Sequence, residues 1–433
     1  MLVLAIIALL FALLFLAVPV SFAMLIAGMV GLYAVGGYFP VVGVLKSGPY
    51  EHVASYTLST LPMFVLMAEV MGASNVTRDL FRAANGWVGH LRGGLAYAAV
   101  SGGVLLAAVC GSSSAAAATL SSAIHPEMRR YGYSDAFSTG ALAAVGTLAI
   151  MIPPSIALVL YGILTETSVG RLLIAGLMPG LLTALAYVVT IQLVIRLRPT
   201  SAAQSLERVP MKKRIQTSLP ALPMFGLLVA MIVLIYTGVV TPTEIGALGA
   251  LCAFLIALTL GRLNRQMISQ AVFRATRSSA MILGIVAFSA VFAVFLTLSG
   301  APQKILTLVQ SSGLSSFSVL LMVLAVLLML GIFLDQIAIL IITMPLVFPL
   351  MTGLGYDAIW LGIIVVKTAE IGLLTPPVGL NLFIVSATSK VPVATVARGV
   401  TPFVIAELVV LAILVAFPQI SLWLPGSSTA IGG

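Results

Sequence analysis

Apolar stretches of about twenty residues recur along the whole length of this chain. Folded as a helix, one such stretch is long enough to cross the ~30 Å hydrocarbon core of a lipid bilayer. Of the 433 residues, 61% are hydrophobic and only 8% are charged, whereas soluble domains carry about a quarter charged residues. This balance excludes a water-soluble globular fold. The sequence therefore predicts an all-α integral membrane protein.

Ten of the stretches are predicted as full spans. They lie near 2–18, 20–38, 58–77, 135–164, 170–196, 219–238, 243–261, 279–298, 358–388 and 393–417. A secretory signal would carry basic residues before its apolar part, but the first Lys or Arg of the chain is Lys46. We therefore interpret the first stretch as a true span.

Two further apolar segments, 95–125 and 314–350, are interrupted by polar residues. Gly111-Ser112-Ser113-Ser114 divides the first, and Asp335-Gln336 divides the second. Each half is too short to cross a bilayer comfortably. We therefore predict two re-entrant helical hairpins with polar tips near the midplane, where protein or a water-filled cavity must surround them.

The basic residues predict the orientation in the membrane, because Lys and Arg concentrate on the cytoplasmic side. If both termini lie outside, sixteen Lys and Arg fall on inside segments, and only Lys46 and Lys304 fall on outside loops. Segment 262–277 carries four of the sixteen and is predicted to lie flat on the inner surface. The net charge of +9 thus indicates topology anchors and contacts with anionic membrane lipid, not nucleic acid.

A shift of 223 residues superposes a series of prolines and glycines within the chain. The pairs are Pro126 and Pro349, Gly132-Tyr133 and Gly355-Tyr356, Pro153-Pro154 and Pro376-Pro377, Gly176 and Gly399, and Pro179 and Pro402. We therefore predict a first repeat over 1–196, a cytoplasmic basic link over 197–218 and a second repeat over 219–433. The first hairpin opens from the inside and the second from the outside, so the repeats are inverted, as in many secondary transporters.

The chemistry is expected at four helix breaks, which are the two hairpin tips and the two paired prolines. A proline removes an amide donor and clashes with the carbonyl one turn earlier, so a pair leaves several carbonyls free to coordinate a cation. The alternative for the prolines is a structural kink, and the alternative for the serines of the first tip is close helix packing. Asp335 is an intramembrane acid, which favours a functional role, and a monovalent cation would neutralise it.

Several other charged residues lie within or at the ends of the apolar segments, and among them Glu69 is interpreted as structural. Lys367 and Glu370 stand at i and i+3, which favours a mutual ion pair and leaves ion or proton coupling as the rival interpretation. Glu244 follows Thr241 by three residues, as expected of a helix cap. Glu407 is interpreted as structural.

These motifs, in this order, resemble the large membrane subunit of the tripartite ATP-independent periplasmic (TRAP) transporters, over essentially the whole chain. The matching stretches are Leu61-Pro62-Met63-Phe64-Val65-Leu66-Met67-Ala68-Glu69, Gly89-His90-Leu91-Arg92-Gly93-Gly94-Leu95-Ala96, Gly111-Ser112-Ser113, Ile152-Pro153-Pro154-Ser155, Thr241-Pro242-Thr243-Glu244 and Glu370-Ile371-Gly372-Leu373-Leu374-Thr375-Pro376-Pro377-Val378-Gly379-Leu380-Asn381-Leu382-Phe383.

The resemblance implies an elevator-type ion transporter fold in the cell inner membrane, coupled to Na+ without an organic cofactor. It implies three partners: a separate small four-span membrane subunit, a periplasmic solute-binding protein, and an organic acid cargo such as a dicarboxylate. Transferred motif by motif, the sodium-site candidates are Ser112, Ser114, Pro153, Asp335, Thr375, Gly379 and Asn381. The substrate or coupling candidates are Ser113, Pro154, Gln336, Glu370, Pro376 and Pro377. Lys367 departs from the pattern, because a charge so close to the glutamate motif is unusual.

Three alternatives remain at this point. A proton-coupled carrier or exchanger of similar architecture would use Glu370 or Asp335 as its proton site, and its uptake would be sodium-independent and pH-dependent. A membrane-embedded enzyme would need a nucleophile–base pair or a metal cluster, and none is evident, since all three histidines lie in loops or at span ends. A purely structural subunit would not need hairpins and broken helices. We therefore expect a transporter and not an enzyme.

Overall fold

The computed structural model describes residues 1–74, 76–198 and 208–427, and within them the regular elements are all helices. In the first half these are α1 (Leu2–Phe15), α2 (Val20–Gly36), α3 (Tyr38–Val53), η1 (Tyr56–Ser59), α4 (Thr60–Ala73), α5 (Val76–Val88), α6 (Gly94–Cys110), α7 (Ser113–Arg130), α8 (Asp135–Met151), α9 (Ile156–Leu164) and α10 (Val169–Leu197). The second half contains α11 (Met211–Ser218), η3 (Leu219–Ala221), α12 (Leu222–Thr237), α13 (Pro242–Thr259), α14 (Arg265–Leu298), α15 (Ala301–Ser311), α16 (Ser316–Phe333), α17 (Gln336–Gly353), α18 (Ala358–Leu374), α19 (Leu380–Ser389), α20 (Val393–Ala416) and α21 (Gln419–Ser427).

The described helices confirm the all-α membrane class. Eight of them are long and apolar enough to cross a bilayer, or nine if the bent pair α8–α9 counts as one span. Ten full spans were predicted. Part of the difference lies at the N-terminus, where α1 and α2 are apolar but have only 14 and 17 residues.

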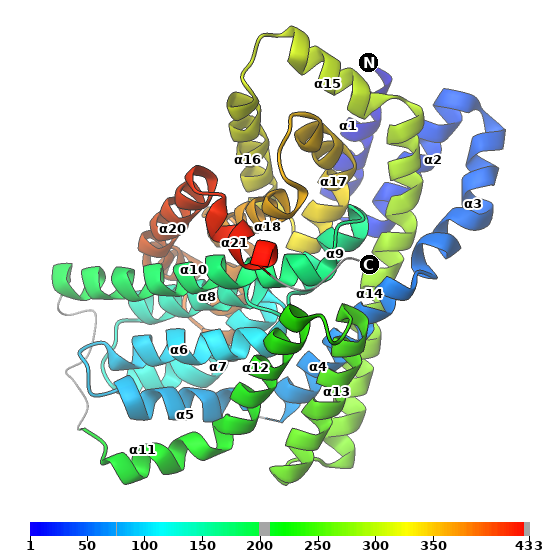
Figure 1. Cartoon of the computed structure of the whole chain (residues 1–433). Coiled ribbons are helices and arrows are strands. Elements are labelled where there is room, and N and C mark those ends of the chain that lie inside the picture. The colour runs from blue at the N-terminus through cyan, green and yellow to red at the C-terminus, as the bar shows by residue number, and fades with distance from the viewer. Residues whose placement is uncertain (75, 199–207, 428–433) are drawn as a thin grey trace.

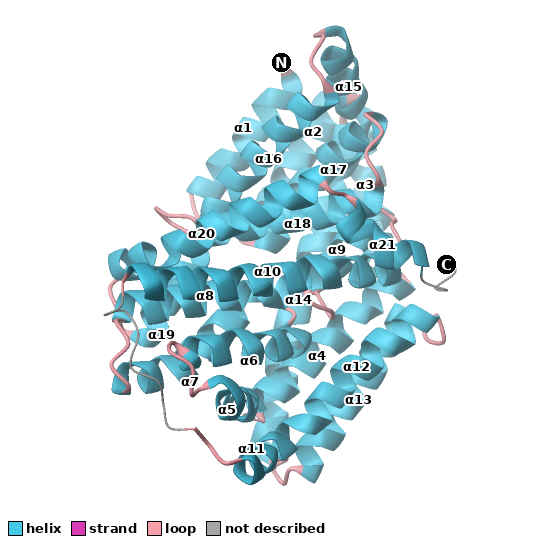
Figure 2. Cartoon of the chain, turned by 60° about the vertical axis from the view of Figure 1, so that its left-hand side comes forward, coloured by secondary structure: helices cyan, strands magenta, loops and turns pink. Residues whose placement is uncertain are grey.

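Helix boundaries repeat at the 223-residue offset found in the sequence. Moved by 223 residues, the bounds of α7 become those of α17, and the bounds of α8 become those of α18, at both ends. The amphipathic helix α5 corresponds to α15, with which it shares only the C-terminal bound at this offset, and the two lie toward opposite ends of the molecule in both views (Figures 1 and 2). The inverted orientation of the two halves in a membrane stays a prediction.

Each interrupted segment forms a pair of helices joined by a short polar turn. Gly111-Ser112 joins α6 to α7, and Leu334-Asp335 joins α16 to α17. The expectation that each half is too short to span was wrong for the second pair, because α16 and α17 have 18 residues each and are apolar enough by length and composition. The carboxylate of Asp335 accepts a hydrogen bond from the amide of Ala338 and caps the start of α17.

Four segments differ from their sequence-based descriptions. The outside loop that carries Lys46 is the helix α3, and Lys304 also lies in a helix, α15. The basic segment 262–277 is not a separate surface helix. Most of it forms the start of α14, where Met267, Ala271 and Ala275 are buried at four-residue spacing and continue directly into the apolar part. The predicted link contains α11, and its residues 199–207 lie outside the described residues.

Two groups of helices make up the core. In one group, α14 packs against α2, α3 and α4, and α13 packs against α4 and α12. In the other, α8 and α18 lie at the centre, with buried side chains along almost their whole lengths. Glycines permit the closest crossings here: a Cβ on Gly399 of α20 would overlap the carbonyl oxygen of Ala136 of α8. Each of the two central helices, α8 and α18, ends just before one of the paired prolines.

Candidate functional site

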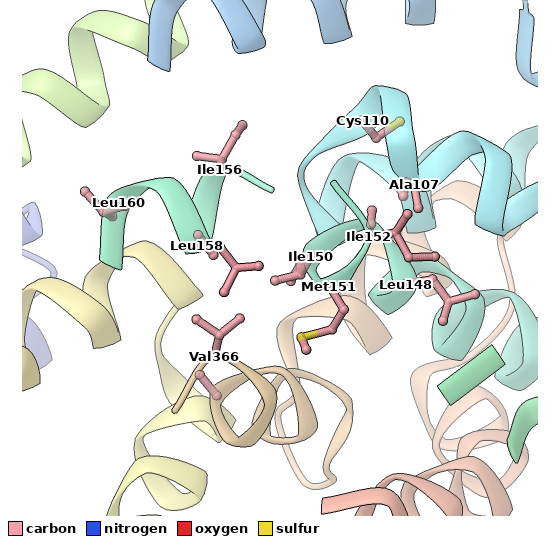
Figure 3. Packing of buried hydrophobic residues seen from close by; sticks show 14 of the residues in the cluster. Ala107, Cys110, Leu148, Ile150, Met151, Ile152, Ile156, Leu158, Leu160 and Val366 are labelled. Atoms are coloured by element: carbon pink, nitrogen blue, oxygen red, sulfur yellow. The ribbon is translucent and has the colours of Figure 1, made fainter. Parts of the chain in front are cut away.

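The first break, residues 152–155, separates α8 from α9, and the two helices bend by 43° there. All four of its residues, among them Pro153 and Pro154, are buried. The hydroxyl of Ser155 accepts a hydrogen bond from the amide of Leu158 and starts α9. The amide of Ile156 donates to the carbonyl oxygen of Gly111 at 3.3 Å. The first break is thereby tied to the first hairpin tip, and apolar side chains on both sides of it fill the surroundings (Figure 3).

The second break, residues 375–379, separates α18 from α19. The Thr375 hydroxyl donates back to the carbonyl of Ile371 at 2.7 Å, and Gly379 has a φ of +49°, which favours glycine. The amide of Gly379 donates to the carbonyl of Ile332 at 3.1 Å. Since Gly379 is the 223-residue counterpart of Ile156, the same position ties each break to the hairpin of its own half.

Asn381 joins the second break to the first hairpin tip. It lies buried in the first turn of α19, and its Nδ2 donates to Oγ of Ser113 at 2.5 Å. Its Oδ1 accepts from the hydroxyl of Ser114 at 3.3 Å. Farther along the same two helices, the hydroxyls of Ser121 and Thr388 are 2.9 Å apart. Three of the predicted site residues are thus in contact across the two halves.

The second tip makes a different set of contacts. Asp335 caps α17, and Nε2 of the buried Gln336 donates to the carbonyl of Val366 in α18 at 3.1 Å. The counterpart of Asn381 in the first half is Leu158, which lies in the apolar core and returns no such polar contact to the second tip. Among the described residues, no hydrogen bond joins Asp335 to the serines of the first tip.

The two breaks also differ in exposure. Pro153 and Pro154 are buried, whereas Pro376 and Pro377 are exposed and Thr375 is half-buried. Both Pro–Pro peptide bonds are cis. The second break is therefore the more open of the two in this conformation.

These residues offer two kinds of chemistry. Hydroxyl, amide and carboxylate oxygens, together with carbonyls freed at the breaks, are ligands that suit a sodium ion in transporters. The helices α7, α9, α17 and α19 all begin at a tip or a break, and a helix N-terminus favours an anionic group. The groups at the tips and breaks are therefore of the kinds that suit a cation or a carboxylate.

A buried charged cluster lies where α8, α10, α18 and α20 meet. Nζ of Lys367 lies 2.5 Å from Oε2 of Glu407 and 3.5 Å from Oε2 of Glu370, and it donates to Oγ1 of Thr183 at 3.0 Å. The Tyr187 hydroxyl donates to the other oxygen of Glu407. The three charged side chains are 0% exposed, so the cluster is closed to water within the described residues.

Sequence reasoning found this cluster only in part. The expected pairing of Lys367 with Glu370 is present, but the shorter contact is with Glu407, which stands 40 residues away. One feature of the sequence points to the cluster: the 223-residue offset places Thr147 at the position of Glu370. The Thr147 hydroxyl is hydrogen-bonded to Tyr187 and Glu407. No pattern in the sequence indicated Tyr187 or Thr183.

Comparison with known proteins then places the chain. The family model described as "Tripartite ATP-independent periplasmic transporter, DctM component" matches residues 7–420. The chain belongs to this family. It is 41% identical over 379 residues to a C4-dicarboxylate TRAP transporter large permease protein of Pseudomonas aeruginosa, covering 87% of this chain and 88% of the relative. A large permease protein of the same description from Vibrio cholerae is 34% identical over 396 residues, with 86% of each chain covered.

The fold is also similar to that of a solved transporter whose sequence identity to this chain is much lower. The YdaH transporter of Alcanivorax borkumensis matches with a TM-score of 0.62 at 13% sequence identity, over 90% of each chain. This likeness supports the fold alone. With the family assignment, the hairpins and broken helices of this chain are those of a DctM component, a multi-span membrane subunit of a TRAP transporter.

Proposed function

We propose that this chain is the large membrane subunit of a sodium-coupled TRAP transporter that imports a small organic acid by an elevator mechanism. The observation that carries the proposal is the contact of Asn381 with Ser113 and Ser114, which places oxygen ligands of both halves together at a helix break. A sodium ion at such a place bridges the halves. Ion coupling requires in addition that the binding energy of the ion differ between the conformations of the transporter.

The packing of the hairpins supports movement of one group of helices as a body. The break residues Ile156 and Gly379 are hydrogen-bonded to the hairpins of their own halves, and α7 packs on α19 while α17 packs on α9. The charged cluster adds ties between α18, α10 and α20. We infer that these helices carry the site past α2, α4 and α12–α14.

The helix N-termini at the tips and breaks suit a carboxylate cargo, and both relatives named above are described as C4-dicarboxylate permeases. We therefore propose a small organic acid, with dicarboxylates first among the candidates. In this proposal a periplasmic binding protein delivers the acid, and a separate small four-span subunit completes the membrane unit. The complex sits in the cell inner membrane with both termini of this chain outside.

Uptake into proteoliposomes tests the proposal. The chain is reconstituted with its small subunit and binding protein, and radiolabelled organic acids are offered with and without an inward sodium gradient. We expect accumulation that requires both sodium and the binding protein. Accumulation driven by a proton gradient alone would reject sodium coupling and favour the proton-coupled carrier. Uptake that proceeds without the binding protein would reject the tripartite mode of delivery.

A further inference from the structure

The cluster around Lys367 contains more acid than base. Two carboxyl groups, those of Glu370 and Glu407, flank a single ammonium group, and all three side chains are 0% exposed. Among the described residues, the helices packed around them contribute Tyr187 as a further titratable group, with Thr147 and Thr183 as neutral hydroxyls. If both acids were ionised, the described cluster would hold one uncompensated negative charge in an interior closed to water.

The two carboxyl groups are not equivalent. Glu407 lies 2.5 Å from Nζ of Lys367 and accepts a hydrogen bond from Tyr187. Glu370 lies 3.5 Å from the same Nζ. Within the described residues neither oxygen of Glu370 accepts a hydrogen bond of good geometry, although the Thr147 hydroxyl lies nearby. Glu407 is thus the closer partner of Lys367, and Glu370 keeps only the longer contact with the same ammonium group.

A buried acid that shares one ammonium group with a closer carboxylate favours its neutral form, because an uncompensated negative charge in the interior is costly. A metal ion is a poor neutraliser here. It would need several oxygen ligands and would lie close to the positive charge of Lys367, which already faces Glu370 at 3.5 Å. A proton needs only one carboxyl oxygen.

We propose that the cluster is a proton-binding site and that Glu370 carries the proton at neutral pH. Lys367 and Glu407 then form a neutral ion pair, and the whole cluster has no net charge. The site is distinct from the proposed sodium ligands at the hairpin tips and breaks, and it does not depend on sodium coupling. A neutral cluster would also let α8, α10, α18 and α20 move through a bilayer without carrying a net charge across it.

Infrared difference spectroscopy of the purified protein tests the proton directly. A protonated carboxyl group has a C=O stretch that is separate from the carboxylate bands and shifts when H₂O is replaced by D₂O. We expect this band in the wild type and in the control Glu51→Gln, which changes an exposed glutamate of α3. We expect its loss in Glu370→Gln. A band that is unchanged in a folded Glu370→Gln protein would overturn the proposal.

A second variant tests the same proton without changing Glu370. In Glu407→Gln, Lys367 loses its closer anionic partner, so Glu370 should ionise to replace it. The carboxyl band should therefore disappear although Glu370 is intact. Persistence of the band in Glu407→Gln would contradict the charge assignment.

The pH dependence of unfolding gives an independent measurement on detergent-purified protein without any ion gradient. At pH values above the range where a free glutamate ionises, the folded wild type should hold one more proton than its unfolded chain does. The midpoint temperature of the wild type should therefore fall as the pH rises. The midpoint temperature of Glu370→Gln should fall less steeply. Equal slopes would reject the proton site. Because no transport is measured, this result is separate from the success or failure of the proposed function.

Discussion

Nδ2 of Asn381 donates a hydrogen bond to Oγ of Ser113, 268 residues earlier in the chain, at 2.5 Å. The two residues belong to different halves of the repeat and to the first turns of α19 and α7. The relationship is one-sided, because the counterpart of Asn381 at the 223-residue offset is the apolar Leu158. The first hairpin tip, and not the second, is therefore where an asparagine of one half meets the serines of the other.

Replacement of Ser113 by alanine should weaken sodium-dependent uptake. The change removes a hydroxyl oxygen from the proposed ion site and leaves Nδ2 of the buried Asn381 without its acceptor, which should lower the stability by about 1–3 kcal/mol and reduce the apparent sodium affinity. The sodium dependence of proteoliposome uptake measures it. Ser122→Ala is the control, since Ser122 is exposed on the same helix and its hydroxyl donates to the carbonyl of Thr119. Equal sodium affinity in the two variants would remove Ser113 from the site.

Replacement of Lys367 by methionine should destabilise the fold strongly. It leaves Glu407 as a buried carboxylate without its cation, and loss of one partner of a buried ion pair costs about 3–5 kcal/mol. The double variant Lys367→Met with Glu407→Gln removes both charges and should recover much of that loss. Thermal unfolding in detergent measures both, with Lys304→Met as the control for an exposed lysine of α15. A double variant no more stable than the single one would show that the pair is not the source of the effect.

The sequence predicted the helical membrane class, the two hairpin segments and both broken helices, because prolines and polar interruptions in apolar runs have few other interpretations. It also predicted the 223-residue offset, which helix boundaries such as those of α8 and α18 reproduce. The arms of the second hairpin were underestimated, because α16 and α17 have 18 residues each. The inverted orientation and the ion site stay predictions.

The charged cluster shows where sequence reasoning stops. Lys367 and Glu370 are one turn apart on a helix, so their pairing follows from helical spacing alone. The shorter contact with Glu407 depends on how α20 crosses α18, and the contact with Thr183 depends on α10. Such crossings are set by packing, for example by the glycines at helix contacts, and they leave no periodic signal in the sequence.

A side chain at Gly372 should disturb the second hairpin. A Cβ there would lie 2.5 Å from Cα of Gly331 and 2.8 Å from the carbonyl oxygen of Leu328, so α16 would have to move away from α18. We expect Gly372→Ala to destabilise the protein by about 1–3 kcal/mol and to reduce uptake. Gly284→Ala in α14 is the control, because nothing lies within 4 Å of its Cβ position and alanine favours the helix by about 1 kcal/mol. Similar thermal stability of the two variants would contradict this account of the crossing.

Replacement of Asp335 by asparagine separates the fold of the second tip from its charge. Asparagine caps a helix about as well as aspartate does, so the hydrogen bond from the Ala338 amide and the start of α17 should be preserved. The negative charge that would neutralise a sodium ion is lost. Asp335→Asn should therefore unfold at nearly the wild-type temperature without sodium, lose the stabilisation that sodium gives the wild type, and take up substrate at least 10-fold more slowly at limiting sodium. Asp357→Asn is a matched control, since Asp357 caps α18 in the same way from an exposed position, and it should behave as the wild type does in both assays. If Asp335→Asn keeps its full sodium response while the control is normal, the carboxylate of Asp335 does not bind the coupling ion, and the oxygens around Asn381 become the remaining site.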